Sequence, residues 1–273
     1  MDNSSQKLKL DILISTYAGG ILDIPRMLLP QRDDVRYTVS MQFSTPSWKE
    51  LVPKELYRRS DVTLDFLPGI GLSRNRNNSI ARSGGDILLI ADDDNVYTDE
   101  YIDTILETWR ENPDADIITF MAEDYEGNPL HEYPAQYVCS VEMTMRRDSI
   151  IWNNLKFDER FGLGSPKLCA GEEEVFLANA RRLGLKILFI PKVIVRTREL
   201  NTTRDFVGDS KLQMTKGATF KYIYGTANAV WRSFKEAGWY MVNRKANPFP
   251  LPPRERRLAR MESRSFRAAK NCG

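Results

Sequence analysis

Residues 86–95 have the sequence Asp-Ile-Leu-Leu-Ile-Ala-Asp-Asp-Asp-Asn, in which an aliphatic run is followed directly by three carboxylates. The first part of this stretch predicts a buried strand, because the run is short and aliphatic. Adjacent like charges at the end of such a strand repel one another and are costly to bury without a cation. Asp92, Asp93 and Asp94 therefore indicate either a solvated strand-to-helix turn or a site for a hard divalent cation, Mg²⁺ or Mn²⁺.

Similar aliphatic runs lie on both sides of this strand, and amphipathic helices separate several of them. The predicted strands are Lys9–Ser15, Val35–Phe43, Asp61–Leu67, Asp86–Ala91, Asp116–Met121 and Leu185–Ile190, the last of which is closed by Pro191. The predicted helices are Thr98–Glu111, with Thr98 as its N-cap, and Glu172–Leu183, which ends at Gly184. This alternation predicts an α/β fold with a central, mostly parallel sheet flanked by helices.

The composition excludes several classes of protein and of site. The chain has 273 residues, of which 42% are hydrophobic and 28% charged, as in soluble globular proteins. Three cysteines and one histidine are too few for a disulfide framework or for a mechanism that needs several histidines. No apolar run approaches the ~18 residues of a membrane span, and the first residues lack the apolar segment of a signal peptide. We therefore expect a cytoplasmic protein.

The charge is unevenly distributed along the chain. Residues 241–273 contain nine basic and two acidic side chains, so that they carry +7 while residues 1–240 carry −5. We expect a folded domain over residues 1–240 and a basic, Pro/Arg-rich tail, or C-terminal extension, over residues 241–273. Residues 254–270 of this tail predict either a solvated extension or peripheral contact with anionic lipid at the inner face of a membrane. Nucleic acid is not an expected partner, because the domain is acidic and has no recognition motif.

Two further motifs carry candidate binding and catalytic groups. Gly69–Asn78 is a glycine-containing turn that enters a predicted helix with Arg74 and Arg76, and it suits either a plain helix start or recognition of a diphosphate. Gly171–Glu174 opens the second predicted helix with three carboxylates. These favour the positive end of the helix dipole, and one of them could equally serve as a general base for an acceptor hydroxyl. A diphosphate site with a metal and a base on one sheet is what transfer from a nucleotide-activated donor requires.

Six motifs occur in order along most of the chain. They are Leu13–Tyr17, Gly71–Ser73 with Arg76-Asn77 and Gly85-Asp86, Asp92–Asp94, Phe157–Gly162, Gly171–Glu173 and Lys186–Val195. In this order and spacing the chain, over about Leu8–Val195, resembles the inverting family 2 glycosyltransferases of the GT-A fold. The resemblance implies a nucleotide-binding half at about 8–97, an acceptor-binding half at about 98–200 and a helical region to residue 240.

The resemblance also implies roles for individual residues. The residues implied to bind the nucleotide-sugar are Ser15, Thr16, Tyr17, Gln42, Arg74, Arg76, Asn77, Asp92 and Asp93, and those implied to hold Mn²⁺ or Mg²⁺ are Asp94 and Asp92. Glu173 is at the position of the catalytic base, with Glu172 as the alternative, and Gly162, Gly164 and Glu172 are on the acceptor side. The implied reaction, of the hexosyltransferase type, moves a sugar with inversion from a nucleotide-sugar to a hydroxyl of a glycan or a lipid-linked acceptor. A UDP-sugar is the expected donor.

The chain departs from the family pattern at three places. Val39–Ser44 lacks the acidic motif that contacts the nucleotide base, Glu173 replaces the usual aspartate base, and Arg196-Thr197-Arg198 stands where many members have a metal-binding histidine. At the last position, either the metal keeps an extra water or arginine supplies positive charge at the diphosphate. Two alternative functions remain open: a metal-dependent nucleotidyltransferase, and a non-catalytic subunit of a polysaccharide assembly system.

Overall fold

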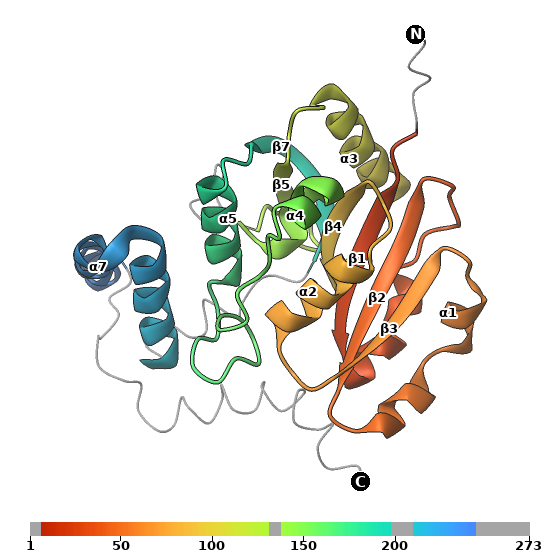
Figure 1. Ribbon diagram of the computed structural model, residues 1–273, viewed down its shortest axis with the longest axis horizontal. Helices are drawn as coiled ribbons and strands as arrows, with labels where there is room; N and C mark the ends of the chain where they lie inside the picture. The colour runs from red at the N-terminus through yellow and green to blue at the C-terminus, as the bar shows by residue number, and fades with distance from the viewer. Residues whose placement is uncertain (1–6, 131–137, 198–209, 244–273) are drawn as a thin grey trace. The chain divides into compact units, whose positions relative to one another are not determined.

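The computed structural model describes residues 7–130, 138–197 and 210–243, and within them seven strands form one sheet (Figure 1). The strands are β1 (Leu10–Tyr17), β2 (Val35–Phe43), β3 (Val62–Pro68), β4 (Ile87–Asp92), β5 (Ile117–Glu123), β6 (Met143–Arg146) and β7 (Ile187–Arg196), in the order β3-β2-β1-β4-β6-β5-β7. β6 pairs antiparallel with β4 and β5, and the other neighbours are parallel. The predicted α/β fold with a mostly parallel central sheet is therefore confirmed.

The register of the sheet brings the ends of its central strands together. Ser15 of β1 is the Cα partner of Asp92 of β4, and Tyr17 of β1 is the partner of Gln42 of β2. Because these strands are parallel, their carboxyl ends open at the same edge of the sheet, where ligands of such folds bind. The register alone therefore gathers candidate residues from three strands at one place.

Helices lie between the strands along the chain. They are α1 (Lys54–Arg58), α2 (Leu72–Arg82), α3 (Asp99–Glu111), α4 (Arg147–Trp152), α5 (Glu172–Arg182) and α7 (Ser210–Asn243), with short 3-10 turns η1 (Ala18–Leu22), η2 (Ile24–Arg26), η3 (Pro46–Leu51) and η4 (Ser140–Glu142). Thr98 caps α3 as predicted, because its hydroxyl accepts a hydrogen bond from the Tyr101 amide at 3.2 Å. α5 ends before Gly184, also as predicted.

The prediction that Pro191 closes the last strand is wrong, since β7 continues to Arg196. β7 is last in the strand order and is thus an edge strand, and its pairing with β5 shifts register between Thr119 and Met121. A proline is tolerated at the edge of a sheet or at such an irregularity, because its nitrogen need not donate to the ladder. β6 is missing from the predicted strands, because four residues are too few to give a periodic pattern.

The core that positions the site joins the sheet to α2 and α5. It is formed by Leu13, Ile80, Leu88, Ile90, Ile117, Met143, Met145, Ile150, Leu155, Phe157, Phe176, Leu177 and Ala180. The Phe157 and Phe176 rings stack within it, with their centroids 4.4 Å apart. Burial of each large apolar side chain of this kind contributes about 1.5–3 kcal/mol to stability. This packing holds the start of α5 beside α2, the helix that carries Arg76.

The chain divides into two compact units, residues 1–159 with 172–199 and residues 160–171 with 200–273. The sheet belongs to the first unit. In the second unit, the Thr215 hydroxyl of α7 accepts a hydrogen bond from the Cys169 amide at 3.1 Å. No helix among the described residues is long and apolar enough to cross a membrane. Residues 254–270 of the predicted basic tail lie outside the described part of the chain.

Candidate functional site

The acid turn, Asp92–Asn95, begins at the last residue of β4 and is held by its neighbours. The Asn95 side-chain oxygen accepts a hydrogen bond from the Asp92 amide at 2.8 Å. The Tyr125 hydroxyl donates a hydrogen bond to the Asp94 carbonyl at 2.6 Å. The turn is therefore anchored at both ends, and it keeps three carboxylates side by side. The contribution of Tyr125 is not visible in the sequence, since this residue is about thirty positions away.

The Asp93 carboxylate accepts a hydrogen bond from the Thr16 hydroxyl at 2.6 Å. Burial raises the pKa of Asp93 to about 6; the Thr16 hydrogen bond opposes this shift, and the charges of Asp92 and Asp94 add to it. A Cβ at position 20 would overlap the side chains of Asp93 and Thr16, so any larger residue there would displace the two side chains. The sequence pattern does not reveal Gly20 as a site residue, because Asp93 and Thr16 come close to it only in the folded chain.

Replacing Asp93 by asparagine is expected to stabilise the protein above pH 6. The folded-state pKa of about 6 is higher than the ordinary 3.8, so the carboxylate lowers stability increasingly as the pH rises through these values. At about 1.4 kcal/mol per pKa unit, the gain in Asp93→Asn is on the order of 3 kcal/mol at about pH 8 and becomes small near about pH 4. Urea unfolding at the two pH values measures the gain, and an equal effect at both would contradict this account of Asp93.

Arg76 connects the acid turn with the start of α5, and it is 1% exposed. Its Nη2 atom lies 3.3 Å from Asp92 Oδ1 and donates a hydrogen bond to the Ser140 hydroxyl at 2.6 Å. Its Nη1 atom lies 3.3 Å from Glu172 Oε1 and 3.2 Å from Glu173 Oε1. Three carboxylates from elements far apart in the sequence therefore share one buried guanidinium. We call these residues the Arg76 cluster.

The charges of the Arg76 cluster shift one another's titration. Burial raises the pKa of both Glu172 and Glu173, and the Arg76 charge opposes the shift in both. Burial lowers the pKa of Arg76, but the carboxylates of Asp92, Glu173 and Glu172 outweigh that effect, so the guanidinium stays charged. A carboxylate whose pKa is raised toward neutrality is a better proton acceptor than a fully solvated one. Glu172 and Glu173 thus have the chemistry expected of a general base.

Buried polar atoms without protein partners occur beside the carboxyl ends of β1 and β2. Gln42 Oε1 accepts a hydrogen bond from the Gly71 amide at 3.1 Å, while Gln42 Nε2 has no partner among the described residues. Asn75 donates to the Thr16 carbonyl at 3.2 Å, and its side-chain oxygen, like Ser15 Oγ, has no partner within the described part of the chain. Because buried polar groups are normally paired, these atoms indicate that a polar ligand or water binds here.

Other residues assigned to the nucleotide-sugar are engaged with the protein itself. The Asn77 side chain donates to the Phe157 carbonyl at 2.9 Å and accepts from the Phe157 amide at 2.8 Å, so it positions that segment. Arg74 donates to the Pro68 carbonyl at 2.8 Å. Tyr17 is half-buried at the end of β1. Tyr17 is at the carboxyl end of β1 and Arg74 contacts the carboxyl end of β3, where the ligand is expected, whereas Asn77 holds the Phe157 segment.

Two further sets of predicted site residues are not members of the Arg76 cluster. Gly162 and Gly164, assigned to the acceptor side, belong to the loop 160–171 of the second unit and both have positive φ. Arg196, which stands at the position of the family's histidine, has its Nε atom 2.5 Å from Glu123 Oε1. A carboxylate therefore already balances the Arg196 charge, which does not favour a role for this arginine at a diphosphate.

The donor atoms of the acid turn fit a metal that is held partly by its substrate. Asp92 and Asp94 have carboxylate oxygens at the end of β4, where Asp92 also contacts Arg76, and Asp93 is engaged by Thr16. Within the described residues, no group of three His, Cys, Asp or Glu side chains is placed to hold a metal ion by itself. Mg²⁺ is commonly bound by one or two carboxylates, with substrate phosphates and water completing its coordination. The residues present therefore fit such an ion together with a diphosphate.

Comparison with known proteins identifies the family. Residues 43–169 match the family described as Glycosyl transferase family 2. The chain contains a family 2 glycosyltransferase domain. The matched segment of this glycosyltransferase includes Arg76 and the acid turn but ends before Glu172. The roles of Glu172 and Glu173 therefore depend on the geometry of the Arg76 cluster.

Solved structures share the fold of this glycosyltransferase. The structure of S. aureus TarS 1-349 matches with 13% identity and a TM-score of 0.58, over 86% of this chain and 75% of that chain. TarS 1-349 in complex with UDP-GlcNAc matches with 12% identity and a TM-score of 0.56, over 86% and 76%. Mannosyltransferase PcManGT from Pyrobaculum calidifontis, in complex with GDP-Man and Mn²⁺, matches with 14% identity and a TM-score of 0.51, over 96% and 81%. No curated protein sequence gives a match. The predicted family, GT-A-like fold and enzyme class are confirmed.

Proposed function

We propose that this glycosyltransferase moves a sugar from a nucleotide-sugar to an acceptor hydroxyl, with inversion at the anomeric carbon. The observation that carries the proposal is the Arg76 cluster, in which one guanidinium joins Asp92 to Glu172 and Glu173. The acid turn and the candidate bases are thus parts of one network. Inverting transfer needs both, because a base must activate the attacking hydroxyl while the diphosphate leaves from the opposite face.

Glu173 is the proposed general base, with Glu172 as the alternative. Burial raises the pKa of both carboxyls, which suits a group that accepts a proton near neutral pH. Glu173 takes the proton of the acceptor hydroxyl as its oxygen bonds to the anomeric carbon and the bond to the diphosphate breaks. Arg76 holds the carboxylates in place, so it is a positioning residue for this step.

The proposed donor is a UDP-sugar, bound at the carboxyl ends of β1, β2 and β4. The Gln42 Nε2 atom, buried and without a partner among the described residues, is a hydrogen-bond donor suited to a carbonyl oxygen of uracil. Ser15, Thr16 and Tyr17 lie on β1, the neighbour of the strand that carries Gln42, and we assign Asp92 and Asp93 to the sugar. Among the structures with this fold, TarS is in complex with UDP-GlcNAc and PcManGT with GDP-Man, so both bases need to be tested.

The proposed metal ligands are Asp94 and Asp92, with Mn²⁺ or Mg²⁺ as the ion. When bound, the ion supplies positive charge that stabilises the departing diphosphate. The acceptor is proposed to be a glycan or a lipid-linked compound, and the resemblance to the family assigns Gly162, Gly164 and Glu172 to the acceptor side. A cytoplasmic location, and contact of residues 254–270 with an anionic membrane surface, are proposed together with such an acceptor.

The nucleotide is identified by thermal unfolding of the full chain with UDP, GDP, CDP and dTDP, each with and without Mn²⁺ or Mg²⁺. A nucleotide at about 100 times its dissociation constant adds about 2.7 kcal/mol to the free energy of unfolding. We expect one nucleotide, UDP, to stabilise the protein in a metal-dependent way. If none of the four stabilises it, the proposal is wrong and a non-catalytic subunit becomes the better description.

The Asp94→Ala variant is expected to lose metal-dependent stabilisation by UDP while its fold survives. The Asp94 carbonyl, which the substitution leaves in place, accepts the hydrogen bond from Tyr125 that anchors the acid turn. Asp114→Ala, which removes an exposed aspartate outside the site, provides the matched control. The same unfolding experiment measures both variants. Asp94 would not be a metal ligand if its variant kept the full metal-dependent shift.

A further inference from the structure

The second segment of α7 carries exposed apolar side chains and contains no residue of the Arg76 cluster. α7 bends at Gly225, where φ is +78° and ψ is 169°, and the helix resumes at Thr226. After the bend, Val230, Trp231 and Phe234 are 52%, 62% and 76% exposed. Large apolar side chains that are exposed together mark an interaction surface.

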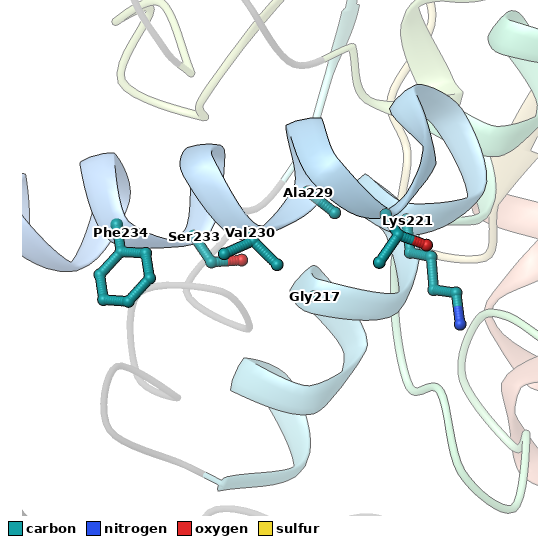
Figure 2. Close-up of a pocket in the computed structure, with 7 residues that line it drawn as sticks. Gly217, Lys221, Ala229, Val230, Ser233 and Phe234 are labelled. Atoms are coloured by element: carbon teal, nitrogen blue, oxygen red, sulfur yellow. The ribbon is translucent and has the colours of Figure 1, made fainter.

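Val230 and Phe234 belong to one stripe of the helix, and Trp231 lies next to that stripe, three residues before Phe234. The groove beside them is lined by Gly217, Lys221, Thr226, Ala229, Val230, Ser233 and Phe234. Five of these follow the i, i+3, i+4, i+7 and i+8 spacing of a single helix face, counted from residue 226. Figure 2 shows Val230, Ser233 and Phe234 projecting from the same side of the segment. The segment is therefore amphipathic, and its apolar side is open within the described residues.

The first segment of α7, in contrast, is occupied by contacts within its own unit. Leu212 and Thr215 are buried, and the Thr215 hydroxyl accepts a hydrogen bond from the Cys169 amide. Tyr222 packs edge-on against Phe161, with the ring centroids 5.8 Å apart. α7 is thus anchored through its first segment to the loop 160–171. The exposed side chains of the second segment can therefore bind another surface.

Basic residues surround the exposed apolar side chains. The Arg232 guanidinium lies 3.8 Å from the centroid of the Tyr224 ring, and Lys235 Nζ lies 5.6 Å from the centroid of the Trp231 ring. Residues 210–273 contain fourteen basic and three acidic side chains, a net charge of +11 against −9 for residues 1–209. A partner with an anionic surface is therefore favoured, and two such positive segments facing each other in a dimer would repel.

We propose that residues 226–235 of α7 dock the protein on the anionic surface of a lipid bilayer. Val230, Trp231 and Phe234 enter the boundary between headgroups and acyl chains, where aromatic side chains are favoured. Arg232 and Lys235 contact the anionic headgroups. The helix lies in the plane of the surface. This docking surface is separate from residues 254–270, and its existence does not depend on the proposed sugar transfer.

The test is flotation of the full chain with vesicles of phosphatidylcholine, with and without phosphatidylglycerol. Wild type is expected to float with the anionic vesicles, and less so as salt is raised. The double variant Trp231→Ser, Phe234→Ser is expected to bind about a hundredfold more weakly, because withdrawal of each aromatic side chain from water favours binding by about tenfold or more. The matched control is Trp152→Ser, which alters an 81% exposed tryptophan on α4 and is expected to bind like wild type.

Three results would overturn the docking surface. They are no binding of wild type to anionic vesicles, equal binding of wild type and the double variant, and an equal loss in Trp152→Ser. A wild-type dimer in light scattering that the double variant abolishes, without vesicle binding, would identify a second copy as the occupant instead. The UDP-dependent thermal shift is expected to be unchanged in the double variant, so failure of the docking surface and failure of the proposed function are distinguishable.

Discussion

The Glu173→Gln variant is expected to lose sugar transfer by a factor on the order of 10³ in kcat while it still binds the nucleotide. Glutamine cannot take the proton of the acceptor hydroxyl, but its side-chain oxygen can still accept a hydrogen bond from Arg76. The geometry of the Arg76 cluster is therefore preserved, in which Arg76 Nη1 lies 3.2 Å from Glu173 Oε1. The rate of nucleoside diphosphate release measures the loss, and thermal unfolding with the nucleotide checks binding.

Two neighbouring carboxylates provide matched controls for Glu173. Glu172→Gln changes a carboxylate that contacts the same Arg76 atom, and Glu174→Gln changes the third carboxylate of the same turn. We expect Glu174→Gln to remain active and Glu172→Gln to lose less activity than Glu173→Gln. If Glu172→Gln lost more activity than Glu173→Gln, the general base would be Glu172 instead.

Protein stability separates catalysis from folding in these variants. Burial raises the folded-state pKa of Glu172 and Glu173, so each carboxyl favours the folded state at low pH and loses that contribution as the pH rises through its folded pKa. A neutral glutamine avoids this loss. At about pH 8 both variants should therefore be at least as stable as wild type. An inactive Glu173→Gln that was also much less stable would not support a role as base.

Removal of Arg76 is expected to have the largest effect on stability. Arg76→Met leaves Asp92, Glu172 and Glu173 without their shared counter-charge, and breaking a buried ion pair in this way costs about 3–5 kcal/mol. The cost should be smaller at about pH 5 than at about pH 8, because loss of Arg76 raises the pKa of both glutamates further and protonation then removes their charge. Urea unfolding at both pH values measures the difference.

Arg74→Met is the matched control for this loss. Arg74 lies on the same helix, and its guanidinium donates to the Pro68 carbonyl rather than to the cluster. Its replacement is expected to change stability by only about 0.5 kcal/mol. If Arg76→Met lost the same free energy at both pH values, the loss would reflect packing on the Phe157 ring, 5.5 Å away, rather than the uncompensated carboxylates.

The sequence predicts those parts of the fold and site that depend on local patterns. β4 and the acid turn are recognisable because a buried aliphatic run and three charges adjoin one another within ten residues. α3 is recognisable because its cap and its apolar spacing lie within a few turns. The start of α5 is likewise marked by its own carboxylates, although their use as a base has no local signature.

The sequence does not predict features that arise from tertiary packing. Arg76 has the pattern of a diphosphate-binding arginine, but its burial among carboxylates follows from the packing of α2 against α5. Gly20 and Tyr125 reach the acid turn only through the fold. Pro191 is a local strand-breaking signal that the edge position of β7 overrides.

The most direct test of the proposed function is to follow one turnover of nucleotide-sugars by proton NMR. The full chain is mixed with Mg²⁺, which is diamagnetic and leaves the proton signals sharp, and with UDP-glucose, UDP-galactose, UDP-GlcNAc or GDP-Man, with water as the surrogate acceptor. We expect one donor to release its nucleoside diphosphate, and its α-linked sugar to appear first as the β-anomer, with no such release in Glu173→Gln. First appearance of the α-anomer, or formation of a sugar 1-phosphate and a nucleoside monophosphate in place of a nucleoside diphosphate, would contradict inverting transfer by the Arg76 cluster.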